Sequence, residues 1–323
     1  MMANLFYVSS FGGSATLWLA RSLDLHDDII CFHGSRQFPL LPASRNPQQH
    51  LPNSTELTAG EFALRMQILS ETARDTRGRE VFVGGVHGFH GLQMHPAMTT
   101  LDGCFAFSIR HPVLRIASLY NEHYRVMRMN TVDAQGKWAW LRAGYATKHE
   151  ELITLFCTVM EPNPEDVILL WLASVTVWAD YYSARTPDWP IFRMEDYTVN
   201  RDVFQAMFHT LTGNRLACSS EYLDRIFAQG KLNVHRRNSR LPAEEFRSWA
   251  PNGKRIMAAI LRSVPELLEF YQEMGYPVDY VLEHDPFAKE RSTNALSNLL
   301  RHLIGIHTLE EEAPLFRQGR RFA

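Results

Sequence analysis

Small and hydroxyl-bearing residues follow a short apolar segment near the N-terminus, and this combination is suited to binding an anion. Leu5 to Val8 is typical of a strand, and a helix is expected from Thr16 to Leu23. Backbone N–H groups between them can approach an oxyanion closely, because small side chains leave room beside the positive end of the helix. The residues expected to form this loop are Ser10, Phe11, Gly12, Gly13, Ser14, Ala15 and Thr16.

A second group of anion-binding side chains is expected after Phe105 to Ile109, which is apolar enough for a buried strand. Arg110 stands at the carboxyl end of that strand, and Pro112 is suited to the first position of a helix. On this helix Arg115 and Ser118 are three positions apart and share a face. Alternatively, Arg110 caps neighbouring carbonyl groups and Ser118 lies on a solvated helix surface.

Two common nucleotide-binding loops are excluded by the residues of the first loop. A kinase-type loop requires a lysine followed by serine or threonine, and no lysine is present. A dinucleotide-binding loop requires three spaced glycines and a later acidic residue, whereas Gly12 and Gly13 are adjacent and Arg36 follows the second strand. The remaining alternative is that the two glycines only form a tight strand-to-helix turn.

Together the two segments resemble the sulfotransferases that use 3′-phosphoadenosine 5′-phosphosulfate (PAPS). The similarity continues at Phe192 to Tyr197, which is like the Tyr-Glu-Asp stretch of that family. It continues again at His235 to Asn238, followed by Leu241 to Glu245. The resemblance covers most of residues 3–276, with four motifs in the order of the family, and it implies a sulfuryl transfer that requires no metal.

The resemblance also implies roles for individual residues toward PAPS. The first loop binds the 5′-phosphosulfate, while Arg110 and Ser118 bind the 3′-phosphate, for which directed charge-assisted donors are suited. Trp18 stacks on the adenine, or alternatively packs in the core. Arg236 and Arg237 close over the 3′-phosphate, or alternatively belong to a solvated basic face.

The acceptor must lose a proton as it attacks sulfur, so a general base is expected near it. His87 follows a strand that ends at the position where the family has its catalytic histidine, and a neutral imidazole can accept the proton. His33 and His90 are the next candidates on the acceptor side, and the alternative for His33, at the end of the second strand, is a structural role. The nearby Gly84, Gly85 and Gly88 are expected to give space for a substrate.

A metal cluster of His87, His90 and His95 is the alternative interpretation of these histidines. It is disfavoured because no acidic or thiolate ligand is near.

Two positions depart from the pattern of the family. Gly13 stands where the family has a lysine or arginine that polarises the bridging oxygen, so another cation must supply that charge. Arg36 is a candidate, as are the loop N–H groups alone. Met194 stands where the family has a tyrosine, which leaves part of the adenine pocket undefined.

Alternating apolar and amphipathic segments predict an α/β fold with a central parallel sheet flanked by helices. Strands are expected near 4–9, 28–33, 80–86, 104–109 and 189–194, and further helices over 167–182 and from Asn200 to Gly213. We expect a single sulfotransferase domain over 1–286 that contains the phosphate-binding strand-loop-helix. The proline-rich segment 37–58 is expected to be a loop or lid, and 287–323 a helical extension with a basic tail, which is also a candidate homodimer contact.

The 323 residues, 46% of them hydrophobic, are sufficient for a sizeable core, and the net charge of −2 gives no general attraction to nucleic acid. We expect no membrane span, no secretion signal and therefore a cytoplasmic protein, with four widely spaced cysteines in structural positions. The expected partner is a small soluble acceptor, such as a secondary metabolite. The alternative is a non-catalytic protein that binds nucleotide anions and has lost the loop cation.

Overall fold

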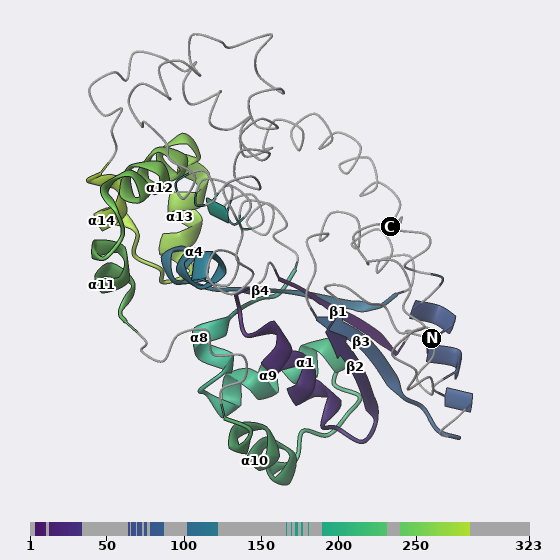
Figure 1. The fold of residues 1–323 in the computed structure, drawn as a ribbon. Helices are drawn as coiled ribbons and strands as arrows, with labels where there is room; N and C mark the ends of the chain where they lie inside the picture. The colour runs from purple at the N-terminus through teal and green to yellow at the C-terminus, as the bar shows by residue number, and fades with distance from the viewer. Residues whose placement is uncertain are drawn as a thin grey trace. The chain divides into compact units, whose positions relative to one another are not determined.

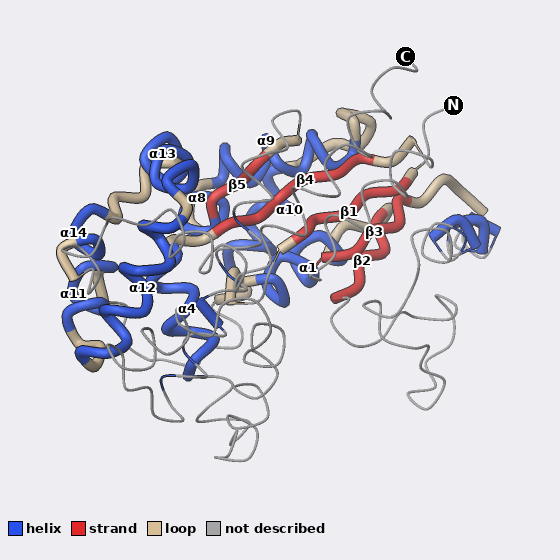
Figure 2. The backbone as a smooth tube through the Cα atoms, turned by 90° about the horizontal axis from the view of Figure 1, so that it is seen from above, coloured by secondary structure: helices blue, strands red, loops and turns tan. Residues whose placement is uncertain are grey.

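The computed structural model describes residues 4–10, 13–33, 102–121, 189–230 and 240–284, and also parts of 64–86 and 166–180. These residues form an α/β fold, as the alternating pattern predicts. Five parallel strands form the sheet in the order β2-β3-β1-β4-β5, as Figures 1 and 2 show. Their bounds are Leu5–Ser9 (β1), Ile29–His33 (β2), Phe82–Val86 (β3), Cys104–Ile109 (β4) and Ile191–Arg193 (β5).

All five strands lie within the segments where strands are expected. The central strand β1 is buried at every residue, and so is β3. Such continuous apolar runs are typical of parallel strands that are covered on both faces. The prediction of strands from short apolar runs is therefore confirmed.

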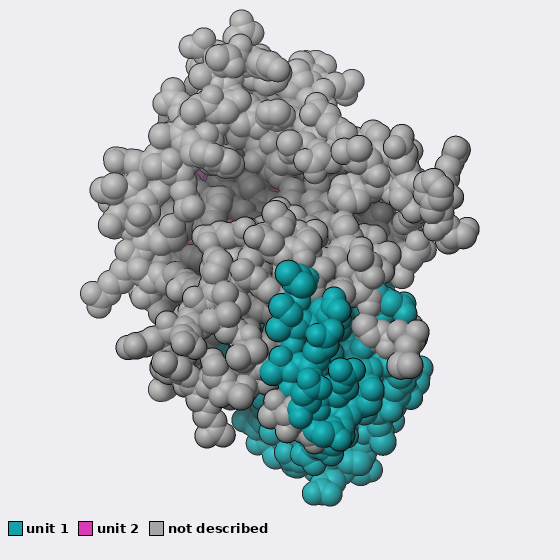
Figure 3. Space-filling view, turned by 90° about the vertical axis from the view of Figure 1, so that its right-hand side faces the viewer, with its two compact units in different colours: residues 1–110, 185–234 teal, residues 111–184, 235–323 magenta. Residues whose placement is uncertain are grey.

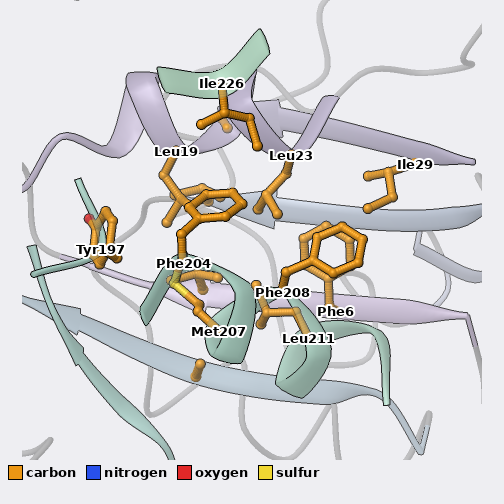
Figure 4. Packing of buried hydrophobic residues seen from close by; sticks show 14 of the residues in the cluster. Phe6, Leu19, Leu23, Ile29, Tyr197, Phe204, Met207, Phe208, Leu211 and Ile226 are labelled. Atoms are coloured by element: carbon orange, nitrogen blue, oxygen red, sulfur yellow. The ribbon is translucent and has the colours of Figure 1, made fainter. Parts of the chain in front are cut away.

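Helices α1 (Thr16–Asp24), α9 (Arg201–Thr212) and α10 (Ser220–Ala228) lie on one side of this sheet. Their apolar side chains pack against β1 and form the core that Figure 4 shows. The Asn200 side chain accepts hydrogen bonds from the first turn of α9, and Gly213 ends the helix in the left-handed region with φ 57°. The expected helix between these two residues is confirmed.

Two glycines inside β3 make room for aromatic rings from the neighbouring strands. Gly84 pairs with Phe6 of β1, and a Cβ atom at Gly84 would lie 2.1 Å from the Phe6 ring. A Cβ atom at Gly85 would lie 2.8 Å from the ring of Phe32. The expectation that these two glycines leave space for a substrate is wrong, because aromatic side chains of the core already fill that space.

The chain forms two compact units, and each takes two separate parts of the sequence. Unit 1 comprises residues 1–110 and 185–234 and contains the whole sheet, whereas unit 2 comprises 111–184 and 235–323. Figure 3 shows the described residues of unit 1 in teal. The described part of unit 2 is helical, with α4 (Pro112–Tyr120), α11 (Pro242–Arg247), α12 (Pro251–Ser263), α13 (Pro265–Glu273) and α14 (Asp279–Leu282).

A buried ion pair lies inside unit 2. The guanidinium of Arg115, on α4, donates to the carboxylate of Asp180 at 2.6 Å, and each side chain is 1% exposed. The hydroxyl of Tyr271, on α13, donates to the other carboxylate oxygen at 2.6 Å. Burial raises the pKa of Asp180, while Arg115 and Tyr271 oppose that rise. Together, Arg115, Asp180 and Tyr271 therefore connect three segments that are far apart in the sequence.

Several expectations about the chain lie outside what the structure describes. The proposed loop 37–58 and the extension 287–323 fall there, and the single domain over 1–286 stays a prediction. Of the expected helix over 167–182, the described residues 169, 172, 173, 176 and 180 are helical. Among the described helices, none is long and apolar enough to cross a membrane.

Candidate anion-binding site

The order of the strands reverses at the carboxyl ends of the neighbouring strands β1 and β4. From β1 the chain continues to β2 and β3, which lie on one side of β1 in the sheet. It then continues to β4 and β5, which lie on the other side of β1. In open parallel sheets, ligands bind in the crevice where the strand order reverses in this way. The loop that follows β1 and Arg110, which follows β4, both lie at this point. Both belong to unit 1.

The backbone of the loop turns sharply into helix α1. Gly13 has φ 77° and Ala15 has φ 52°, so both residues are in the left-handed region. Ala15 occupies the N-cap position of α1 and provides no side-chain hydrogen bond to the first turn. A helix start without a side-chain cap, at the positive end of the helix dipole, is suited to an oxyanion.

Two side chains hold the carbonyl groups of this loop. The Arg110 guanidinium donates to the Gly13 carbonyl oxygen at 2.6 Å, and the Tyr197 hydroxyl donates to the Ser14 carbonyl oxygen at 2.8 Å. Tyr197 is fully buried, and its oxygen also lies 2.8 Å from the Ser108 hydroxyl. The carbonyl of one residue and the N–H of the next point in opposite directions across a trans peptide. The N–H groups of Ser14 and Ala15 therefore point away from Arg110 and Tyr197.

Tyr197 is a residue of the site that the sequence did not single out. It ends α8 (Met194–Tyr197), the single helical turn that follows β5. It is the last residue of the stretch that resembles the Tyr-Glu-Asp motif, three positions after Met194. That stretch was the available signal, and the structure places it beside β4, where Phe192 pairs with Ser108. The pairing itself, however, requires the three-dimensional register.

His33 lies beside the first turn of α1. Its Nε2 atom is 3.0 Å from the Thr16 hydroxyl oxygen, so the end of β2 contacts the start of the helix. Burial lowers the pKa of His33 and favours the neutral ring. This contact agrees with a structural role, the alternative to a role as general base.

Trp18 and the two serines of the loop are buried. The indole of Trp18 is 6% exposed and belongs to the core, stacked against Tyr197 at a centroid distance of 6.2 Å and edge-on to Phe204. This packing favours the core alternative for Trp18 over adenine stacking, which stays a prediction. Ser10, directly after β1, and Ser14 are also buried.

The structure does not test the remaining expected site residues. Phe11, Gly12, His87, His90, Arg236 and Arg237 lie outside the described residues, as does Arg36. Ser118 is half-buried on α4 and belongs to unit 2, whereas Arg110 belongs to unit 1. The shared binding of a 3′-phosphate by Arg110 and Ser118 therefore stays a prediction.

The described residues offer neither a metal site nor an activated thiol. Within that part of the chain, no group of three or more histidine, cysteine or acidic side chains is placed to hold a metal ion. Cys31, Cys104 and Cys218 form no disulfide, and burial raises the pKa of each thiol, to about 11 at Cys218. These cysteines are protonated at neutral pH, as structural cysteines are, and Cys157 lies outside the described residues.

No protein-family model and no curated protein matches this chain. Among solved structures, the crystal structure of a sulfotransferase from Alicyclobacillus acidocaldarius is similar to it, with a TM-score of 0.35 and 15% sequence identity. The match covers 71% of this chain and 92% of that chain. A likeness of this size assigns no family and no activity, so the function must be argued from the residues of the site.

Proposed function

We propose that the protein is a sulfotransferase that transfers the sulfuryl group of PAPS to a hydroxyl or amine of a small acceptor. One observation carries the proposal: the loop between β1 and α1 has its carbonyl groups bonded to Arg110 and Tyr197 at the reversal of the strand order. This arrangement directs backbone N–H groups, rather than carbonyl oxygens, toward a ligand. It supports the binding of an oxyanion such as the 5′-phosphosulfate of PAPS.

The proposed reaction is an in-line displacement at sulfur. A lone pair of the acceptor oxygen or nitrogen forms a bond to sulfur, and the bond from sulfur to the bridging oxygen of the donor breaks. The electron pair of that bond passes to the 5′-phosphate of adenosine 3′,5′-bisphosphate, and the acceptor proton passes to the imidazole of His87. Charge develops on the leaving oxygen, so electrostatic stabilisation by the loop contributes most to the rate.

A non-catalytic protein that binds nucleotide anions is the second candidate. Gly13 favours it, because the side chain that would polarise the bridging oxygen is absent from the loop. The two candidates differ in turnover and agree in binding. Both predict that the protein binds adenosine 3′,5′-bisphosphate.

The test uses the full chain with sulfur-labelled PAPS and a panel of phenols, alcohols and amines, followed by mass spectrometry of the products. A sulfotransferase gives a sulfated product and adenosine 3′,5′-bisphosphate in equal amounts. His87→Asn should lower turnover by about two to four orders of magnitude, the usual contribution of a general base, while donor affinity changes little. Calorimetric binding of the bisphosphate without any turnover would favour the second candidate, and neither binding nor turnover would overturn both.

A further inference from the structure

The guanidinium of Arg110 contacts the loop at residue 13, where the resembled family has its loop cation. We propose that Arg110 supplies the positive charge that Gly13 lacks and thereby strengthens the binding of the 5′ anion of the donor. This inference rests on the proposed function and deepens it. It gives Arg110 a role beside the loop, in addition to the 3′-phosphate contact that the resemblance implies.

The contact is short and directed. Arg110, at the end of β4, donates through one terminal nitrogen of its guanidinium to the Gly13 carbonyl oxygen at 2.6 Å, in the loop that follows the neighbouring strand β1. Arginine stays charged at any pH that the folded protein meets. A hydrogen bond from a charged donor is stronger than one between neutral groups, so the Gly13 carbonyl is held in a fixed direction.

The charge acts on the ligand side of the loop through the peptide between Gly13 and Ser14. A cation at the carbonyl oxygen polarises this peptide, and the N–H group at its other end becomes a stronger donor. That N–H belongs to Ser14 and points away from Arg110. The missing side chain at residue 13 is thus replaced by a charge on the opposite side of the backbone.

Tyr197 provides an internal comparison. It donates to the carbonyl of the next residue, Ser14, at 2.8 Å and with a neutral hydroxyl. Both side chains orient the loop, but Arg110 alone of the two adds charge. A loss of orientation and a loss of charge can therefore be separated by changing these two residues in parallel.

The test measures affinity calorimetrically for adenosine 5′-phosphosulfate, which has no 3′-phosphate, and for adenosine 3′,5′-bisphosphate. Arg110→Gln removes the charge and keeps a hydrogen-bond donor, so both ligands should bind about ten- to a hundredfold more weakly. Arg110→Lys keeps the charge and should retain most of the affinity. Tyr197→Phe should weaken both ligands less than Arg110→Gln does.

A rescue experiment makes the inference specific to residue 13. In the Arg110→Gln background, Gly13→Lys should restore about tenfold in affinity for both ligands relative to Gly13→Ala in the same background. The alanine variant is the matched control, because φ 77° at Gly13 strains any side chain placed there. The same lysine should give no such gain in the Tyr197→Phe background. Thermal unfolding of each variant verifies that it is folded.

Two results would overturn the inference while leaving the proposed function intact. One is a loss on Arg110→Gln that is confined to the bisphosphate, which would make Arg110 a reader of the 3′-phosphate alone. The other is the absence of any gain from Gly13→Lys over Gly13→Ala. If the unmodified protein binds neither ligand, the proposed function fails and this inference fails with it.

Discussion

The ring of Phe6 occupies the space in which a side chain at residue 84 would stand. The two residues face each other on β1 and β3, and a Cβ atom at Gly84 would lie 2.1 Å from the ring. Gly84→Ala therefore forces Phe6 or a strand to move where both strands, β1 and β3, are buried at every residue. We expect the free energy of unfolding to fall by about 3 kcal/mol, at the upper end of the usual cost of overpacking. Chemical denaturation with urea measures this change.

Gly78→Ala is the matched control for that substitution. Gly78 has φ 63°, and no atom lies within 4 Å of the place where its Cβ atom would stand. Its cost is therefore backbone strain alone, about 1–2 kcal/mol. A smaller loss for Gly84→Ala than for Gly78→Ala would show that the core yields easily around Phe6.

The left-handed conformation of Ala15 predicts a stabilising substitution. Ala15 has φ 52°, which costs an alanine about 1 kcal/mol more than a glycine. Ala15→Gly should therefore raise the melting temperature. Part of this gain is offset because glycine increases the conformational entropy of the unfolded chain. Differential scanning calorimetry checks the direction. A lower melting temperature would mean that Ala15 does not adopt this conformation in solution.

The ion pair between Arg115 and Asp180 should be costly to break from one side. Arg115→Met leaves the Asp180 carboxylate buried without its cation, so we expect a loss of about 3–5 kcal/mol in the free energy of unfolding. The double variant Arg115→Met, Asp180→Asn removes the buried charge and should recover part of that loss. Equal stability of the single and double variants, measured by urea denaturation, would contradict this account.

The lowered pKa of His33 predicts a dependence of stability on pH. The ordinary histidine pKa is 6.5, and burial lowers the value in the folded protein. Below pH 6.5 the unfolded chain therefore binds a proton at this residue more readily than the folded one, and stability falls as the pH decreases. The free energy of unfolding of the unmodified protein should fall more steeply between pH 7 and pH 5 than that of His33→Gln. If the free energies of unfolding of the two proteins depend on pH in the same way, groups other than His33 cause that dependence.

The elements around the site could be predicted because their signals are local. A run such as Leu5 to Val8 is apolar at every position, and Asn200 and Gly213 mark the two ends of α9 by their own chemistry. Arg110 could be placed at the carboxyl end of β4 for the same reason. Each of these predictions depends on residues only a few positions apart.

The contacts that define the site could not be predicted in this way. Tyr197 contacts the Ser14 carbonyl from 183 positions away in the sequence, and Arg115 contacts Asp180 from 65 positions away. Both contacts depend on tertiary register, which no local pattern contains. The role of Gly84 was misread for the same reason, because only the pairing with Phe6 reveals that the space beside it is filled.

The pairing of β5 with β4 affects how the chain folds as it leaves the ribosome. Ile191 pairs with Phe107, roughly 80 residues earlier, and closing so long a loop carries an entropic cost that is recovered only when the contact forms. At roughly 5–20 residues per second, synthesis of the intervening segment takes several seconds. Phe204 and Phe208 of α9, which cover β1, emerge later still. A nascent chain that ends before α9 therefore exposes the apolar face of its central strand, and chaperone binding at that stage is the expected consequence.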